Sequence, residues 1–278
     1  MPRSRVAAGP SLAKFSRPRL YNVHKRERLF KRLDEARGHP IVWVAGPPGA
    51  GKSTLVASYI DSRKLPALWY QGDVNDADPA TFFHYARLAV TDFVGARSKA
   101  LANLPRFGPE YTNDLPAFTR RFLRAFFAMF PARALLVVDN FHEAPAAPAW
   151  RFAFSEGLRE LPAHMNLVFL SRTPPPAEMA RLVADQTITQ IASEELRLTT
   201  DEAEALLGDA AVDADTVAAM QRASEGWAAG LVLMREHLSR AGPEASVESV
   251  LPVGKEAVFS YFTGEIFGRA KPNNQRTL

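Results

Sequence analysis

The sequence contains no cysteine, which excludes disulfide bonds, thiolate zinc sites and cysteine nucleophiles. It also lacks an apolar run of about 18 residues, the length a membrane span requires, and its basic N-terminus lacks the apolar core of a secretory signal. The net charge is only +4 over 278 residues, too small a surplus to predict DNA binding by itself. We therefore expect a cytoplasmic protein without a membrane span.

Apolar residues, by contrast, are abundant. They make up 47% of the chain, enough to bury a substantial core, and the 18 phenylalanines argue against disorder. The length fits one large domain, or one domain with one or two small helical modules.

Five short runs of apolar and β-branched residues are typical of buried strands. They span residues 41–45, 67–70, 134–138, 166–170 and 187–191. The stretches between them have helical patterns, at 27–36, 53–62, 79–94 and 115–130. The last of these predicts a buried aromatic stripe of Phe118, Phe122, Phe126 and Phe130. Strands alternating with helices predict an α/β fold, with three α/β/α layers around a parallel sheet of about five strands.

The strand pattern fades after residue 195, and a small helical domain is expected there. Thr199 precedes Glu202 by three positions, a capping-box spacing that predicts a helix through Leu207. Residues 217–238 are largely helical in pattern, with interruptions at Gly226 and Gly230. A linker at 241–253 and an amphipathic helix at 255–267 follow.

Residues 46–54 read GPPGAGKST, directly after the first predicted strand. They match the phosphate-binding pattern G-x-x-x-x-G-K-[ST] in its strand–loop–helix context. Such a loop turns its backbone N–H groups towards phosphate oxygens, and the following helix adds its positive end. The candidate nucleotide-binding residues are Gly46, Pro47, Pro48, Gly49, Ala50, Gly51, Lys52, Ser53 and Thr54.

Three side chains of this loop have distinct expected roles. Lys52 would place its ammonium at the β- and γ-phosphates, and the Ser53 hydroxyl would bind the Mg²⁺ that accompanies the nucleotide. Thr54 would contact the α-phosphate side. The two prolines are interpreted as stiffening the loop.

Asp139 ends the third predicted strand, where a buried carboxylate without a partner is costly. We interpret it as the second Mg²⁺ ligand, the Walker B role, rather than as a helix N-cap or turn residue. The next residue is Asn140, an amide that orients water but cannot accept its proton. His142 and Glu143 are weaker candidates for a base, so slow or absent hydrolysis is expected.

Arg172 follows the fourth predicted strand. At that end of a parallel sheet an arginine could reach the γ-phosphate and report its presence, so we assign it a catalytic or sensor role beside Lys52 and Asp139. An ordinary salt-bridged arginine is the alternative.

These motifs, taken in order, resemble a known family. They are SRPRL at 16–20, RERL at 26–29, the phosphate loop, the Trp69 strand, Asp78-Pro79, VVDNFH at 137–142, LSR at 170–172, ELRLTTDEAEALL at 195–207 and EGWAAGL at 225–231. The chain resembles the nucleotide-binding region of the STAND class of signalling ATPases, in the MalT-like branch of LuxR-type large regulators. The ordered set covers most of residues 16–270.

The resemblance implies more than the residues alone do. It implies that the fourth strand lies between the first and third, that Arg26 lies near the adenine, and that a helical domain with Gly226 and Trp227 folds over the nucleotide. It implies an ADP-bound resting state and an ATP-bound, self-associated active state that also needs an inducer. Core packing is the simpler interpretation of Trp227.

Two departures from the family pattern stand out. Members usually have Asp where this chain has Asn140, and they continue into a winged helix, sensor repeats and a DNA-binding output domain. We expect a basic arm at 1–20, a nucleotide-binding domain at 21–193, a helical domain at 194–242, and a linker with the start of a truncated winged helix at 243–278. A truncated product, a fragment and a partner acting in trans remain open.

Three functions compete on this sequence. The leading one is a signalling switch of a transcriptional regulator that binds ATP or ADP with Mg²⁺ and contacts DNA only through an output domain that this chain lacks. A small-molecule P-loop kinase would need an Arg-rich lid and an acceptor pocket, for which the sequence gives no convincing signal. Direct DNA binding by the arm at 1–20 is the third, although a solvated tail is the simpler interpretation of that arm.

Overall fold

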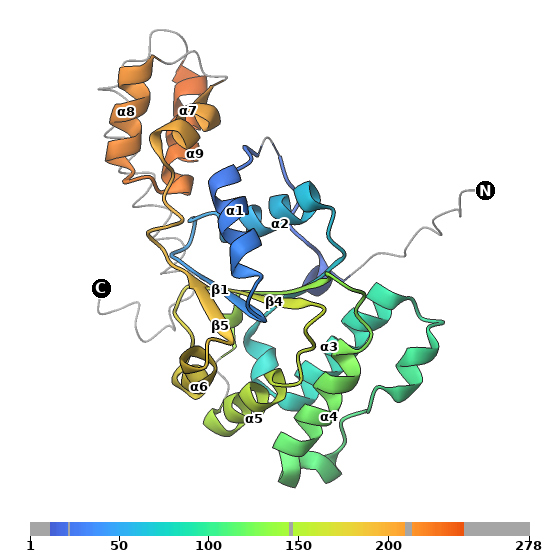
Figure 1. Cartoon of the computed structure of the whole chain (residues 1–278). Coiled ribbons are helices and arrows are strands. Elements are labelled where there is room, and N and C mark those ends of the chain that lie inside the picture. The colour runs from blue at the N-terminus through green and yellow to red at the C-terminus, as the bar shows by residue number, and fades with distance from the viewer. Residues whose placement is uncertain (1–11, 22, 145–146, 209–212, 242–278) are drawn as a thin grey trace, which may run out of the picture. The chain divides into compact units, whose positions relative to one another are not determined.

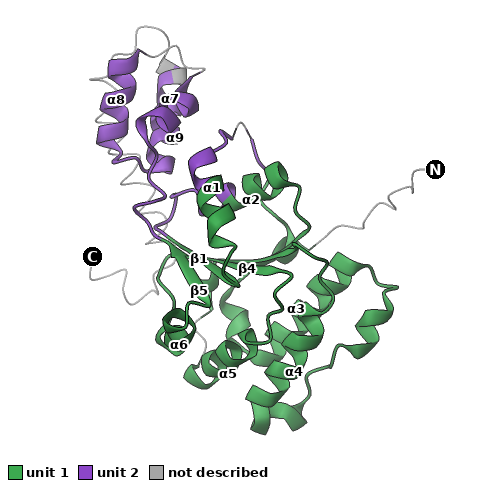
Figure 2. Cartoon of the chain, viewed as in Figure 1, with its two compact units in different colours: residues 1–19, 30–45, 56–191 green, residues 20–29, 46–55, 192–278 purple. Residues whose placement is uncertain are grey.

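The computed structural model describes residues 12–21, 23–144, 147–208 and 213–241. The chain forms two compact units (Figure 2). Unit 1 comprises Met1–Arg19, Phe30–Ala45 and Val56–Ile191, and unit 2 comprises Leu20–Leu29, Gly46–Leu55 and Ala192–Leu278. The phosphate loop thus groups with the helical C-terminal part, although the sequence led us to place it in a domain of residues 21–193. The expected linker and winged-helix start at 243–278 lie outside the described residues.

Unit 1 is built on a five-stranded parallel sheet in the order β2-β3-β4-β1-β5 (Figure 1). The strands are β1 (Ile41–Ala45), β2 (Ala67–Gln71), β3 (Leu135–Asp139), β4 (Asn166–Ser171) and β5 (Ile188–Ile191). All five runs predicted from the sequence are strands, each within about one residue of its expected bounds. β4 pairs with both β1 and β3, which confirms the strand position implied by the family resemblance.

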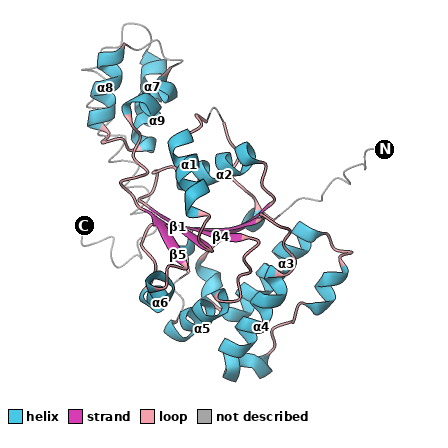
Figure 3. Cartoon of the chain, in the orientation of Figure 1, coloured by secondary structure: helices cyan, strands magenta, loops and turns pink. Residues whose placement is uncertain are grey.

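Helices cover both faces of this sheet (Figure 3). The unit 1 parts of α1 (Glu27–Ala36) and α2 (Lys52–Arg63) lie on one face. The other face carries α3 (Pro79–Val94), α4 (Leu115–Phe127) and α5 (Pro148–Leu158), and the short α6 (Ala180–Ala184) follows β4. This arrangement confirms the predicted α/β/α layers. No helix among the described residues is long and apolar enough to span a membrane.

The core between the sheet and α3–α5 is largely aromatic. The predicted stripe of α4 is buried, at 3% exposure or less for Phe118, Phe122 and Phe126 and 4% for Phe130. The helix ends at Phe127, three residues earlier than predicted, and Phe130 enters the core from the following tight turn, where its N–H donates to Phe127 O. Pro131 accounts for the early end, because the residue before a proline disfavours helical geometry.

Part of the N-terminal arm packs on this unit, which corrects the solvated-tail interpretation for Lys14 and Phe15, whereas neighbours such as Ser16 and Arg19 are exposed. Lys14, in the 3₁₀ turn Ala13–Phe15, donates to Asp73 and, at 2.9 Å, to Asp76. Its side chain is only 9% exposed. Phe15 packs against Tyr70 with ring centroids 6.0 Å apart.

In unit 2, three helices enclose a small apolar core. They are α7 (Thr200–Leu207), α8 (Ala214–Ala223) and α9 (Ala228–Ala241). The predicted capping box is present, with Thr199 and Glu202 each accepting from the other's backbone N–H. The predicted interruption at Gly226 separates α8 from α9, with φ at +71°, whereas Gly230 lies inside α9 and does not break it. The buried residues shared by the three helices include Ala203, Leu207, Val217, Met220, Leu231 and Met234.

Candidate nucleotide-binding site

The phosphate loop of unit 2 follows β1 and leads directly into α2, which begins at Lys52. Gly49 and Gly51 have φ of +73° and +83°, a backbone region that side chains larger than glycine rarely adopt. Alternation of such residues with right-handed ones turns successive N–H groups to the same side and makes an anion-binding concavity. The first turn of α2 adds the N–H groups that every helix start leaves without intrahelical acceptors. The glycines therefore stand where a phosphate cradle requires them.

Lys52 is folded over this loop. Its Nζ donates to Gly46 O at 2.7 Å and to Pro47 O at 3.0 Å. The ammonium is thus held at the concave loop, and the sequence pattern requires a cation there to meet phosphate oxygens. Ser53 and Thr54 follow within the first turn of α2, as the sequence predicted.

The segment that opens α9 holds the loop by its carbonyl groups. Trp227 Nε1 donates to Pro48 O at 2.9 Å, and Ala229 N donates to Gly49 O at 3.0 Å. A Cβ on Gly49 would lie 2.6 Å from Ala229 Cβ and 2.7 Å from the Trp227 ring. A Cβ on Gly46 would lie 2.8 Å from Leu196. The loop is therefore packed against residues more than 140 positions away, with no room for larger side chains at these glycines.

A cavity of about 310 Å³ lies beside the loop within unit 2. Pro47 and Ala50 line it from the loop, Leu196 and Arg197 from the segment before α7, and Trp227 from the start of α9. Small-molecule pockets in proteins start at about 300 Å³. The sequence did not reveal this cavity, because its walls come from three separated segments.

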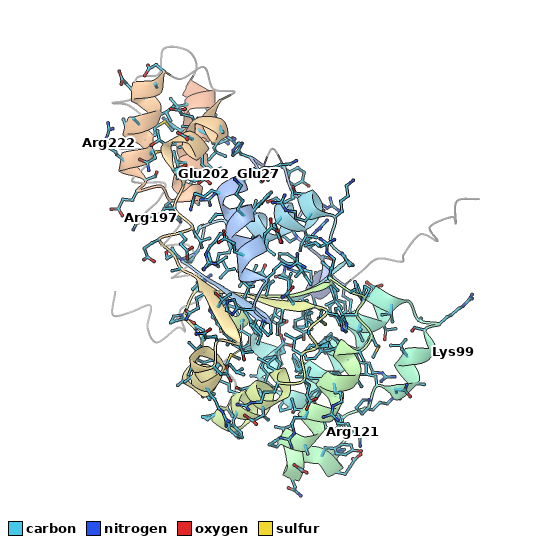
Figure 4. All side chains as sticks on the ribbon, in the orientation of Figure 1. Glu27, Lys99, Arg121, Arg197, Glu202 and Arg222 are labelled. Atoms are coloured by element: carbon cyan, nitrogen blue, oxygen red, sulfur yellow. The ribbon has the colours of Figure 1, made fainter. Side chains whose placement is uncertain are left out.

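Arg26 is buried in unit 2 and anchors one wall of this region. Its guanidinium donates to Leu196 O, Arg197 O and Glu202 Oε2, each at 2.9 Å. Figure 4 labels Glu202, the ion-pair partner of Arg26, and Arg197, which lines the cavity. Among the described residues, Arg26 Nε and Glu202 Oε1 are buried without a hydrogen-bond partner. The guanidinium expected near an adenine is therefore engaged mainly with the protein.

The charges of this pair are strongly coupled. Burial alone would raise the pKa of Glu202, but the hydrogen bond and charge of Arg26, with smaller contributions from Thr199 N and Arg28, outweigh it and lower that pKa. Burial lowers the pKa of Arg26, against the opposing effect of Glu202. Such an ion pair fixes the backbone at 196–197, because two of the guanidinium's bonds end on carbonyl groups there.

Asp139 belongs to unit 1 and lies at the carboxyl end of β3, as predicted. It is 3% exposed, and its Oδ1 accepts from the backbone N–H of Asn140 at 2.9 Å. Gly72 N donates to Asp139 O at 2.7 Å, which ties the end of β3 to the residue after β2. Asn140 adopts a left-handed conformation with φ of +57°, so the chain turns sharply after the carboxylate. Asparagine tolerates this conformation better than most residues do.

Arg172 follows β4 in the same unit. Its backbone N–H donates to His142 Nδ1 at 3.3 Å, and its guanidinium is 4.0 Å from Glu143. The loops after β3 and β4 are therefore linked. The long distance to Glu143 makes this ion pair weak. Both candidate bases, His142 and Glu143, thus lie in the loop that contacts Arg172.

No group of three or more acidic or histidine side chains that could hold a metal exists among the described residues. A nucleotide-borne Mg²⁺ needs fewer protein ligands, because it keeps several waters and binds the phosphates themselves. The buried Asp139 carboxylate and the Ser53 hydroxyl at a helix start are, each by itself, oxygen donors of the kind that such an ion accepts. The structure brings together the loop, Trp227 and the wall held by Arg26 in unit 2, and in unit 1 it links Arg172 to the loop that follows Asp139.

Comparison with known proteins gives a consistent result, although no protein-family model matches the chain. The regulator "HTH-type transcriptional regulator MalT" of Cronobacter sakazakii is 31% identical over 195 residues, which cover 69% of this chain and 21% of that protein. The MalT of Vibrio cholerae is 26% identical over 268 residues, 92% of this chain and 28% of that protein. The chain thus spans under a third of the length of these relatives.

A solved structure supports the fold independently. A Walker-type ATPase of Pyrococcus abyssi superposes with a TM-score of 0.57 at 12% identity, over 87% of this chain and 74% of that one. At so low an identity this likeness concerns the fold alone. Together with the sequence relatives and the loop geometry, it identifies the chain as a MalT-like nucleotide-binding region with the P-loop fold.

Proposed function

We propose that this chain is an ATP/ADP-binding switch module of the STAND type, acting in a transcriptional regulator with slow or absent hydrolysis. The observation that carries the proposal is the phosphate loop itself, with Gly49 and Gly51 at positive φ and its carbonyl groups held by Trp227 and Ala229. A loop whose carbonyls are bonded on one side keeps its N–H groups available for an anion on the other.

Different residues are assigned to the phosphates, to the Mg²⁺ ion and to the γ-phosphate. Backbone N–H groups of residues 46–54 and the Lys52 ammonium hold the phosphates. Ser53 is the candidate Mg²⁺ ligand of unit 2, and Asp139 is that of unit 1. The ion, when bound, neutralises phosphate charge. Arg172 is the candidate sensor of the γ-phosphate.

The nucleoside would occupy the cavity of about 310 Å³ beside the loop. Its wall at Leu196 and Arg197 is fixed by Arg26, which bonds both carbonyls. We therefore assign Arg26 a positioning role for this wall, because its buried guanidinium holds the carbonyl groups there and does not line the cavity itself.

Switching follows from the bonds between the loop and α9. When phosphates bind the loop, the backbone conformation of Pro48 and Gly49 changes. Their hydrogen bonds with Trp227 and Ala229 change with it. Hydrolysis is slow because Asn140 stands where a carboxylate base would be needed. A role in transcription regulation rests on the names of the relatives, and DNA contact is assigned to none of the described residues.

Direct titration with Mg-ADP and Mg-ATP tests the proposal. Lys52→Ala removes a charged hydrogen-bond donor, worth about 1.5–3 kcal/mol, so nucleotide affinity should fall at least tenfold. Lys31→Ala, which removes an exposed lysine from α1, is the matched control and should leave the affinity unchanged. Isothermal titration calorimetry on the full chain measures both, with circular dichroism to verify folding. Equal affinities for the folded Lys52→Ala variant and the wild type would refute nucleotide binding by this loop.

A further inference from the structure

Unit 1 contains a second cavity, of about 230 Å³, that the nucleotide site does not use. It lies where β2, β3 and β4 end, on the side of α3 and α5. In open parallel sheets this edge is the usual place for ligands. The residues that matter for its chemistry are Tyr70, Asp76, Phe141, Trp150 and Thr173.

The walls of this cavity are mainly aromatic and mutually supported. Phe82 lies 5.3 Å from Trp150 and 5.4 Å from Phe154, measured between ring centroids. Phe141 closes another side and lies 6.2 Å from Phe154. The Phe82–Phe154 pair is edge-to-face, Phe82–Trp150 is tilted and Phe141–Phe154 is stacked, so each ring is held by at least one neighbour. The cavity is thus a preformed apolar space rather than a gap between mobile side chains.

Asp76, one of several polar residues that line this cavity, is a buried carboxylate that also accepts from Asp73 N. Asp76 is 5% exposed, and its carboxylate accepts from Tyr70 Oη at 2.6 Å and from Lys14 Nζ at 2.9 Å. Burial, followed by the charge of Asp76, raises the pKa of Tyr70, so its hydroxyl stays protonated and donates. Trp150 Nε1 donates to Asp76 O at 3.2 Å. A charged residue kept in an aromatic wall provides a fixed hydrogen-bonding end.

The cavity also touches both loops that carry the candidate Asp139 and Arg172. Phe141 and His142 line it and directly follow the turn at Asn140. Thr173 lines it as well, follows Arg172 and accepts from Trp43 Nε1 at 2.9 Å. A molecule in the cavity would therefore contact the loop after β3 and the loop after β4 together.

We propose that this cavity is an effector site for a small, mostly apolar ring compound with one hydrogen-bonding group. An apolar cavity of about 150 Å³ holds benzene, so the volume here suits one ring system with a substituent and excludes a drug-sized ligand. Occupancy alters the loops of Asp139 and Arg172 and thereby the affinity for nucleotide. This second statement rests on the proposed function, whereas the binding of the ring compound does not.

Indole is a suitable probe, because it combines an apolar ring system with one N–H donor. In the full chain labelled with ¹⁵N and free of nucleotide, indole should shift the Trp150 side-chain N–H resonance saturably. The Trp227 resonance, from the other cavity, should stay unchanged. A shift that does not saturate, or one at Trp227 instead of Trp150, would overturn the site.

Two variants locate the binding. Val138→Phe fills the cavity from β3 and should weaken indole binding at least tenfold. Phe152→Ala removes a 53% exposed ring from α5 beside the cavity-lining Arg151, and should leave binding unchanged. Because Val138→Phe could disturb folding, the Trp150 shift in the wild type stands as the independent measurement. Equal indole affinity in a folded Val138→Phe variant would overturn the site.

The regulatory step is measured by titrating Mg-ADP with and without saturating indole. Coupling free energies between sites are typically about 1–3 kcal/mol, so a change in ADP affinity of at least fivefold is expected. Unchanged ADP affinity with indole bound would refute the coupling. A chain that binds indole at Trp150 but no nucleotide would refute the proposed function and leave the cavity assignment intact.

Discussion

The two units fix their candidate loops by different means. In unit 1 the end of β3 is held by its sheet neighbour, because Gly72 N donates to Asp139 O directly after the paired strand. In unit 2 the phosphate loop is held by Trp227 and Ala229, about 180 positions further along the chain. The first arrangement follows from the sheet alone. The second exists only when the helices of unit 2 have folded, so the loop and those helices should respond to mutation as one body.

The two units also differ in what their cores enclose. The core of unit 1 is largely aromatic, and most of its ion pairs are partly exposed, with the buried Lys14–Asp76 pair as an exception. Unit 2 encloses the Arg26–Glu202 pair, whose side chains are each 9% exposed, beside a small aliphatic core. Loss of the buried Arg26–Glu202 pair should therefore cost more than loss of an exposed pair such as Arg63–Asp34 of unit 1.

The largest expected effect is that of Glu202→Ala. The substitution leaves the Arg26 guanidinium buried without its carboxylate and removes half of the capping box of α7. Breaking a buried pair costs about 3–5 kcal/mol of unfolding free energy. Urea unfolding followed by circular dichroism measures it. Glu236→Ala, which breaks the exposed pair with Arg240, should cost less than about 0.5 kcal/mol. Both pairs belong to unit 2, so similar costs for the two variants would mean that burial does not decide what loss of an ion pair costs.

A smaller effect is expected from Gly49→Ala, compared with Gly95→Ala in unit 1. Both glycines have positive φ, +73° and +85°, so alanine is strained at either, by about 1–3 kcal/mol. The Gly95 Cβ would meet nothing within 4 Å, whereas the Gly49 Cβ would meet Ala229 and Trp227. Overpacking adds about 1–3 kcal/mol at Gly49 alone. Chemical unfolding of the two variants gives this difference, and equal losses would mean that α9 does not constrain the loop.

Most of the fold was predictable because β1 to β4 carry apolar runs that both sheet faces bury, whereas β5 has Thr189 and Gln190 at its centre. The helix α5 was not predicted. Pro148 suits the first turn of a helix, and the buried Trp150, Phe154 and Leu158 recur at a spacing of four, but Gly157 weakens the helical pattern. Gly157 is tolerated because Thr119 and Leu123 of α4 leave no space for a Cβ there. Tertiary contact thus outweighs local preference in this segment.

The candidate site also has parts that local sequence predicts and parts that only tertiary contacts reveal. The phosphate loop, Asp139 and Arg172 were found because their spacing or their position after a strand is local information. The contacts of Trp227 and Ala229 with the loop end on backbone carbonyl groups, which leave no mark in the sequence. Glu202 was recognised as a capping residue, but its ion pair spans 176 positions and no periodic pattern indicates it.

The smallest expected effect is a difference in acid sensitivity between the units. The pKa of Glu202 is lowered, so its stabilising contribution is present above the ordinary glutamate value of about 4.3 and is lost as pH falls through the lower folded value. Glu202→Gln should therefore flatten the decline of unfolding free energy below about pH 4.3.

Asp34 of unit 1 provides the comparison. Burial would raise its pKa, but hydrogen bonds from Arg63 and Tyr59 outweigh this and lower it, so the sign is the same. Its side chain is 43% exposed, however, and solvent screens the pair. Asp34→Asn should thus flatten the acid limb less than Glu202→Gln does, in urea unfolding at a series of pH values. If the Asp34 variant flattens the acid limb more, solvent does not weaken the surface pair. The buried pair of unit 2 then does not dominate acid stability.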